Sequence, residues 1–363
     1  MKNYLRRNGA WIGFLALAVI ITIATDGGFL SARNLSNLVR QASINGLLAG
    51  GMTLIILTGG IDLSVGSVVA LCGILAGLTQ VNHGWAGLGA VGAWGSLAVA
   101  VLAGTLIGAL NGTLIAVLRL APFVITLGMM VMARGFALIL SDGAAIAPVG
   151  ESLGSLANAN LPMPWTVAFT TVVLMTLIWR GLRIGKAERG DLVFPFATLA
   201  LLSYAFITYR GIPVLSLFLM AVLGVLGFVL ARTTFGRSVY ALGSNERAAY
   251  WAGVPLKKVT ILVYIIMGAL AGLGGLLLTA RLNGADPNAG QLFELDAIAA
   301  VVIGGTSLKG GQGSIMGSFI GALMIATLNN GMDLLGVSSF YQMVFKGLII
   351  VVAVSLDHGQ RRG

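Results

Sequence analysis

The sequence predicts an all-α, polytopic transmembrane helix bundle, and its composition, its run lengths and its charge placement carry that prediction. Apolar residues make up 57% of the 363 residues, charged residues only 9%, and the mean hydropathy is +0.96. A soluble domain carries about 25% charged residues, so this chain has too few charges to cover a water-exposed surface. Residues 93–117 and 259–280 are apolar runs of the length, about 20 residues, that crosses a bilayer as a helix.

The placement of the basic residues fits a membrane protein. Lys2, Arg6 and Arg7 precede the first apolar run, and Arg361 and Arg362 follow the last. Cytoplasmic loops collect Lys and Arg, so we expect both termini on the cytoplasmic side and an even number of crossings. This placement explains the net charge of +10, and we therefore expect a lipid bilayer and no nucleic acid as partner.

The first spans are separated by charged or glycine-rich segments. Residues 1–25 could be a secretory signal peptide, but no small-residue cleavage site is evident and further spans follow, which favours an uncleaved first helix. A glycine-rich break alone separates the second span from the third, and Arg119 ends the fourth on the cytoplasmic side. We expect these spans, and the fifth, at residues 10–25, 44–58, 63–79, 93–118 and 122–140.

The remaining spans follow an outer loop that contains Pro148 and Pro162. The dense basic loop 180–189 must be cytoplasmic, and it precedes a hairpin of two spans. We expect these spans at residues 165–179, 192–209, 214–230, 259–280, 295–303, 315–328 and 340–356. Residues 295–303 are too short to cross alone, so the expected number of spans is about 10–12. No linker or soluble domain interrupts them, which predicts a single transmembrane domain over residues 1–363.

Glycine is abundant, with 52 residues, and some of the glycines are spaced so that they lie on one face of a helix. Small residues four positions apart let membrane helices approach closely. The series Gly104–Gly108–Gly112 and the pair Gly268–Gly272 follow this spacing, so we expect them to serve helix packing.

Two glycine-rich breaks, residues 59–67 and 304–314, interrupt apolar runs. Irregular backbone at membrane depth persists only where it is buried in protein or lines a wet cavity, and paired glycine-broken helices are the usual sequence pointer to a transport site. Tight turns at the cytoplasmic face explain them equally well. The residues that we expect along a translocation path are Gly59, Gly60, Asp62, Ser64, Gly66, Gly304, Gly305, Thr306 and Arg134.

Several charged residues lie within or beside the spans, where they usually face the bundle interior. Arg134 is the deepest and has no acid within one turn, so its partner must come from another span, or its side chain must snorkel. Asp62 could equally cap a helix that starts at Leu63. The other such residues are Glu294, Asp296, Asp333 and Lys346.

The polar stretch 232–258 predicts a short cytoplasmic helix. Ser244 or Asn245 can cap its start, Gly253 can end it, and Pro255 prevents its continuation. This helix could be an interfacial anchor or a knob that docks on a cytoplasmic partner. Its candidate residues are Ser244, Asn245, Glu246, Arg247, Tyr250, Trp251 and Gly253.

Several sequence patterns are missing. The chain has no phosphate-binding Gly-x-x-x-x-Gly-Lys-Ser/Thr motif. Its single cysteine, Cys72, excludes an internal disulfide and a CxxC site, and His83 and His358 lie in an outer loop and in the C-terminal tail. We therefore expect no metal or other cofactor and no membrane enzyme. An ion-coupled secondary transporter remains an alternative, with only Asp62 and Arg134 as deep ionisable groups.

Four segments carry a resemblance that covers most of the chain. They are Gly-Gly-Ile-Asp-Leu-Ser-Val-Gly-Ser (59–67), Phe-Gly-Arg-Ser-Val-Tyr-Ala-Leu-Gly-Ser-Asn-Glu-Arg-Ala-Ala (235–249), Glu-Leu-Asp-Ala-Ile-Ala-Ala-Val-Val-Ile-Gly-Gly-Thr-Ser-Leu-Lys-Gly-Gly-Gln-Gly-Ser-Ile (294–315) and Asn-Asn-Gly-Met-Asp-Leu-Leu-Gly-Val (329–337). With their spacing, these segments resemble the ribose/xylose-type permeases of ABC sugar importers.

The resemblance implies the subunit that carries a monosaccharide through the bacterial inner membrane. Its partners would be a second permease copy in a homodimer, a cytoplasmic ATPase that binds the ATP, and a periplasmic sugar-binding protein. Residues 232–258 would form the cytoplasmic coupling loop, and 244–253 the helix that enters a groove on the ATPase. The commoner members have one span between the outer loop and Phe235, whereas this chain has three, which resembles the xylose-type branch and favours a pentose.

Overall fold

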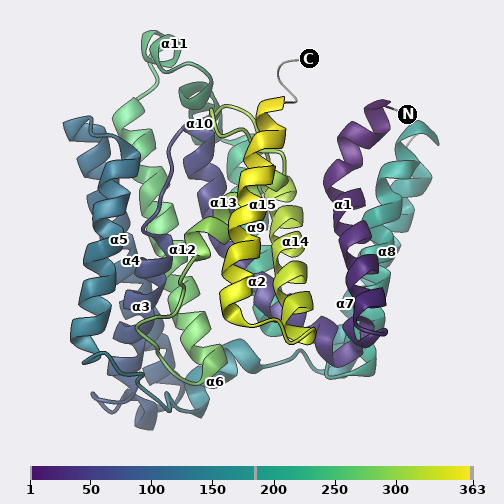
Figure 1. Cartoon of the computed structure of the whole chain (residues 1–363), viewed down its shortest axis with the longest axis horizontal. Helices are drawn as coiled ribbons and strands as arrows, with labels where there is room; N and C mark the ends of the chain where they lie inside the picture. The colour runs from purple at the N-terminus through teal and green to yellow at the C-terminus, as the bar shows by residue number, and fades with distance from the viewer. Residues whose placement is uncertain (1, 184–185, 360–363) are drawn as a thin grey trace.

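The computed structural model describes residues 2–183 and 186–359, and over these ranges the chain is helical, without a named strand (Figure 1). The all-α class predicted from composition is therefore confirmed. The helices are α1 (Lys2–Ala24), η1 (Gly28–Leu30), α2 (Ala32–Leu57), α3 (Val65–Gln80), η2 (Trp85–Leu88), α4 (Ala90–Leu118), α5 (Pro122–Leu140), α6 (Glu151–Asn158), α7 (Met163–Arg183), α8 (Lys186–Thr208), α9 (Val214–Arg232), α10 (Thr234–Ser244), α11 (Glu246–Trp251), α12 (Leu256–Leu282), α13 (Phe293–Ile303), α14 (Ile315–Leu334) and α15 (Ser339–Gly359).

Many of these helices are long and apolar, as a polytopic membrane protein requires. Within the described ranges, six can cross a membrane by length and composition, namely α4, α5, α7, α9, α12 and α14. Shorter apolar helices lie within α1, α3 and α8. The polytopic architecture is therefore confirmed. A total of about 10–12 spans requires α2, α13 or α15 to cross as well, and that number stays a prediction.

The two ends of the molecule carry different elements. In Figure 1 the start of α1, the end of α15 and both α10 and α11 lie at one end, which we call the α11 end. The short helix α6 lies at the opposite end, the α6 end. The first and last described helices thus begin and end on the side of the predicted cytoplasmic loop, as an even number of crossings requires.

Three helices, α7, α8 and α9, separate α6 from α10, as the span order predicted. Helices α7 and α8 pack on each other and, together with α1, lie along one side of the molecule (Figure 1). Helices α7 and α8 thus lie at the periphery of the bundle, while α2 is buried along most of its length in the centre.

The glycines predicted to serve helix packing lie in the contact between α4 and α12. A Cβ atom added at Gly104 or Gly108 would overlap the carbonyl oxygen of Gly268 or Tyr264, and one added at Gly268 would overlap that of Gly104. Gly112 meets α12 at Ile261. The two backbones are therefore in direct contact, which only glycine permits at these positions. The packing prediction is confirmed.

Candidate functional site

The short helix α11 forms as predicted from the polar stretch. The side-chain oxygen of Asn245 accepts a hydrogen bond from the Ala248 amide at 3.0 Å, so Asn245 is the cap, whereas Ser244 ends α10. Gly253 has a φ of +79°, and its amide donates to the carbonyl of Tyr250 at 3.0 Å. The sequence analysis missed α10, which fills the first half of the same stretch.

The tip of α11 exposes two aromatic side chains. Trp251 is 84% exposed and Tyr250 is 64% exposed. Their rings are 5.8 Å apart in an edge-to-face arrangement. Glu246 and Arg247 are also exposed, on the same short helix. Aromatic residues and Arg are enriched where proteins bind one another, so this tip has the composition of a docking surface.

The two glycine breaks meet each other at the last turn of α10. The amide of Gly311, in the second break, donates to the carbonyl of Leu57 at 2.9 Å, directly before the first break. A Cβ added at Gly243 of α10 would overlap that same Leu57 carbonyl, and one added at Gly310 would lie 3.0 Å from the Gly59 amide nitrogen. The close backbone approach joins both breaks to the segment that carries α11.

The second break begins where α13 ends. Gly304 packs against Gly317 of α14 so closely that a Cβ there would overlap the Gly317 carbonyl oxygen. Gly305 has a φ of +87°, with open space around it. The Thr306 amide donates to the carbonyl of Val301 at 3.1 Å, which closes the end of the helix.

Asp62 and Ser64 form a local turn before α3. The carboxylate of Asp62 accepts hydrogen bonds from the amide of Ser64 at 2.8 Å and from its hydroxyl at 2.6 Å. The helix begins at Val65, two residues later than expected, and the hydrogen bonds between Asp62 and Ser64 close a turn that precedes it. The amide of Asn111 on α4 donates to the Ser64 hydroxyl at 3.2 Å, and this contact fixes the turn in the bundle.

Arg134 and Gly66 both meet the segment between α12 and α13. The guanidinium of Arg134 donates to the carbonyls of Pro287 and Ala289, so its partners are backbone groups of the segment between two helices and not, as expected, a residue of another span. A Cβ added at Gly66 would overlap the carbonyl oxygen of Gly290 and the carboxylate of Glu294. The first break thus starts near the contact between Leu57 and Gly243 of α10, and it ends at the segment between α12 and α13.

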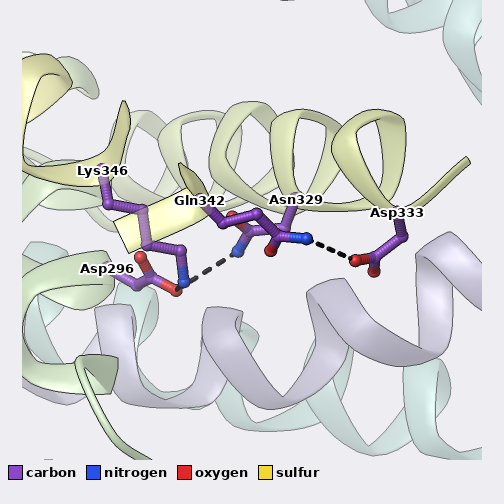
Figure 2. A network of polar contacts seen from close by, with 5 residues as sticks. All are labelled: Asp296, Asn329, Asp333, Gln342 and Lys346. Carbon is purple, nitrogen blue, oxygen red and sulfur yellow. Dashed lines mark hydrogen bonds and ion pairs between the residues drawn. The ribbon is translucent and has the colours of Figure 1, made fainter. Parts of the chain in front are cut away.

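A polar cavity lies between α2, α12, α13, α14 and α15, and its network is shown in Figure 2. The ammonium of Lys346 lies 2.8 Å from the carboxylate of Asp296. Asn329 donates to that carboxylate at 3.3 Å, and Gln342 donates to Asp333 at 2.9 Å. The cavity, which we call the inner cavity, has a volume of about 120 Å³ and is lined by Gln41, Ile44, Asn45, Leu278, Arg281, Phe293, Asp296, Asn329, Asp333, Gln342 and Lys346.

A second, larger cavity adjoins the first at the α6 end. This outer cavity has a volume of about 700 Å³ and shares Gln41, Arg281 and Asp333 with the inner one. At its wall, Asn34 and Asn330 exchange two amide hydrogen bonds, each 2.9 Å long. The rest of its lining is Asn37, Arg40, Asn158, Tyr209, Arg210, Leu282 and Leu334.

None of the nine predicted path residues lines either of these cavities. The sequence analysis noted Asp296, Asp333 and Lys346 as charges beside spans, but not that they share a cavity. Asn329, which begins the motif 329–337, and Gln342 were not predicted to line a site, because the sequence gives no sign of what faces an amide side chain on a helix. The residues converge because α14 and α15 both pack against the short helix α13, whose first turn carries Phe293 and Asp296.

The described residues place no group of three or more His, Cys, Asp or Glu side chains where a metal ion could be held. The polar groups of the cavities are mainly amides, together with both signs of charge. Such a lining can bind an uncharged polar solute through hydrogen bonds.

Residues 34–354 match the family model described as "Branched-chain amino acid transport system / permease component". The ribose import permease protein of Bacillus subtilis (strain 168) is 39% identical over 357 residues, covering 97% of this chain and 93% of the relative. The xylose transport system permease protein of Escherichia coli (strain K12) is 36% identical over 365 residues, covering 96% and 90%. That of Haemophilus influenzae is 38% identical over 374 residues, covering 97% and 96%. No solved structure matches the chain.

Proposed function

Because the chain belongs to the family of transport-system permease components, we propose that it is the membrane subunit that translocates a pentose in an ATP-driven importer. The observation that carries this proposal is the match, over nearly the full chain, to permeases named for ribose and for xylose. The resemblance to ribose/xylose-type permeases, predicted from four motifs, is confirmed by these relatives. They match at similar identity, so the choice between the two sugars rests on the three helices α7, α8 and α9 where one span is expected in the commoner members, which favours the xylose-type branch.

The energy for transport would come from a separate cytoplasmic ATPase, which also binds the ATP. We propose that residues 232–258 form the coupling loop and that α11 docks on this ATPase. The exposed pair Tyr250 and Trp251, beside Glu246 and Arg247, supports this role. The contact of α10 with both glycine breaks offers a direct mechanical link from α11 into the bundle.

The assembly would contain a second copy of this chain and a periplasmic sugar-binding protein, in a bacterial inner membrane. The whole chain would act as one transmembrane domain without a cofactor of its own. We propose that both termini lie in the cytoplasm with α11, since the basic residues of both termini and of the loop 180–189 favour that side.

The nine predicted path residues remain candidates along the moving part of the path, and contacts join some of them to one of two groups. In the first group, Gly59 lies beside Lys309 and Gly310 of the second break, and Gly310 in turn meets Gly243 at the last turn of α10. Gly66 and Arg134 meet the segment between α12 and α13. We propose that movement of α11 shifts the first group relative to the second.

The test uses the permease purified together with its ATPase in lipid nanodiscs. Addition of the binding protein loaded with D-xylose or D-ribose should raise the rate of ATP hydrolysis, and the unloaded protein should raise it less. A rate of ATP hydrolysis that does not rise when the loaded binding protein is added would contradict the proposal. The ion-coupled secondary transporter is not favoured, because the relatives are named as permeases of import and transport systems.

A further inference from the structure

One buried atom beside the inner cavity has no hydrogen-bond partner among the described residues. Asn329 is only 6% exposed, and its amide nitrogen donates to Asp296. Asn329 lines the cavity, but its amide oxygen is itself closed off from solvent and accepts no hydrogen bond from the described residues. A buried acceptor without a donor is unfavourable, so a rotation of the side chain toward the cavity would let a bound hydroxyl group supply the missing donor.

The remaining lining indicates an uncharged ligand with many hydroxyl groups. Gln41, Asn45 and Gln342 each offer both donors and acceptors. Asp296 and Lys346 neutralise each other at 2.8 Å, and the other two charged lining residues, Arg281 and Asp333, are also opposite in sign, so the lining has no net charge that would select a fully charged ligand. A carboxylate side chain would repel an anion, and an ammonium would repel a cation.

The apolar part of the lining suits the carbon face of a sugar ring. Phe293 and Ile44 contribute apolar surface beside the amides. Pockets for small molecules combine apolar walls with a few placed polar groups in this way. The cavity volume of about 120 Å³ far exceeds the roughly 10–15 Å³ that one water needs, so it has room for a polyhydroxylated solute of a few carbon atoms.

The outer cavity offers a path by which a solute reaches the inner cavity. The outer cavity next to it is lined by Asn158 of α6, by Leu282 at the end of α12 and by Leu334 at the end of α14. These elements lie at the α6 end, opposite to α11 (Figure 1). A solute arriving on the side away from the ATPase would therefore meet the outer cavity first and the inner one next.

We propose that the inner cavity is a binding site for a monosaccharide in transit, with the Asn329 amide oxygen accepting a hydrogen bond from a sugar hydroxyl. This inference rests on the proposed function and names the place in the bundle where the sugar is held. The site lies apart from the glycine breaks, so holding the sugar and transmitting the ATPase movement are tasks of different residues.

The first test measures uptake by the complete transporter in proteoliposomes with Asn329→Leu, which removes the amide at similar volume. Uptake of D-xylose or D-ribose should fall at least tenfold, while loaded binding protein still stimulates ATP hydrolysis, because the coupling helix is untouched. Thr327→Val is the matched control: Thr327 is buried on the same helix, its hydroxyl also has no partner among the described residues, and it lines neither cavity. It should transport like the parent.

The second test measures binding without transport. In a Cys72→Ala background, a cysteine introduced by Gln41→Cys should react with a water-soluble thiosulfonate, and millimolar D-xylose or D-ribose should slow the reaction severalfold. A cysteine introduced by Asn82→Cys, exposed beyond the end of α3, should react equally with and without sugar.

The outcomes separate this inference from the proposed function. If the parent complex imports no pentose, the proposed function itself fails. If it does import pentose, while Asn329→Leu transports normally and the pentoses give no protection, only the cavity assignment is overturned. Protection by L-leucine instead of the pentoses would also overturn it, since that result assigns the cavity to a zwitterion.

Discussion

The ammonium of Lys346 on α15 lies 2.8 Å from the carboxylate of Asp296 on α13, and the two side chains are only 15% and 4% exposed. Helix α13 is short and carries Asp296 in its first turn, so this pair is a main polar contact between it and α15. Removing one member of a buried pair leaves the other charge uncompensated, at a cost of about 3–5 kcal/mol.

The first prediction follows from this pair. Lys346→Met should lower the melting temperature of the purified protein in detergent, because Asp296 loses its counter-ion. The double variant with Asp296→Asn should melt at a higher temperature than Lys346→Met alone, since it buries no unpaired charge. Equal melting temperatures for the parent and Lys346→Met would show that the pair does not stabilise the fold.

The second prediction concerns the cap of α11. Asn245→Ala removes the acceptor of the Ala248 amide, which should destabilise the helix by about 1 kcal/mol. Uptake per ATP hydrolysed should fall. The amount of folded protein in membrane extracts, measured by size-exclusion chromatography, should stay normal.

The third prediction concerns the surface of α11. Trp251→Ala, or charge reversal by Glu246→Lys, should uncouple ATP hydrolysis from transport, because both side chains project from the docking surface. Arg119→Gln is the control, since Arg119 is exposed between α4 and α5 and outside the coupling loop. Normal uptake with both α11 variants would argue against the coupling role.

The fourth prediction concerns the first glycine break. Gly60→Val and Gly66→Val should abolish uptake, because a Cβ at Gly66 would overlap the backbone of Gly290 and one at Gly60 would lie 2.9 Å from the Tyr264 hydroxyl. Gly128→Val on α5 should be tolerated, since no atom lies within 4 Å of an added Cβ there. Wild-type uptake in the Gly60 and Gly66 variants would show that the first break is a structural turn without a role in transport.

The fifth prediction tests the glycine contact between α4 and α12. Gly108→Val and Gly268→Val should prevent accumulation of folded protein, because each added side chain would enter the opposite backbone. The matched control is Gly224→Val on α9, where the surrounding space is open. Fluorescence-detected size-exclusion chromatography of membrane extracts measures the folded fraction of each variant.

The sequence predicted the helices well where composition alone determines them. Pro122–Leu140 was placed at its observed bounds, and the cap and end of α11 followed from Asn245 and Gly253. The hydropathy pattern underestimated α2, which begins at Ala32 although its first turns carry Arg33 and Arg40. Those polar turns are helical because tertiary contacts support them, such as the hydrogen bond from Arg40 to the carbonyl of Ala157.

The polar cavities could not be predicted from the sequence in the same way. Asp296, Asn329 and Lys346 lie on three helices, and no local pattern says which faces of those helices meet. The two glycine breaks were recognised from their composition, but their mutual contact depends on Gly311 reaching the Leu57 carbonyl. Such contacts between distant segments are a property of the packed bundle.

The most direct test of the central claim is sugar accumulation in proteoliposomes that contain the permease and its ATPase. With ATP on the ATPase side and loaded binding protein on the other, labelled D-xylose or D-ribose should accumulate above its external concentration. The permease alone should accumulate none, even under a proton or sodium gradient. Gradient-driven accumulation by the chain alone would contradict the account.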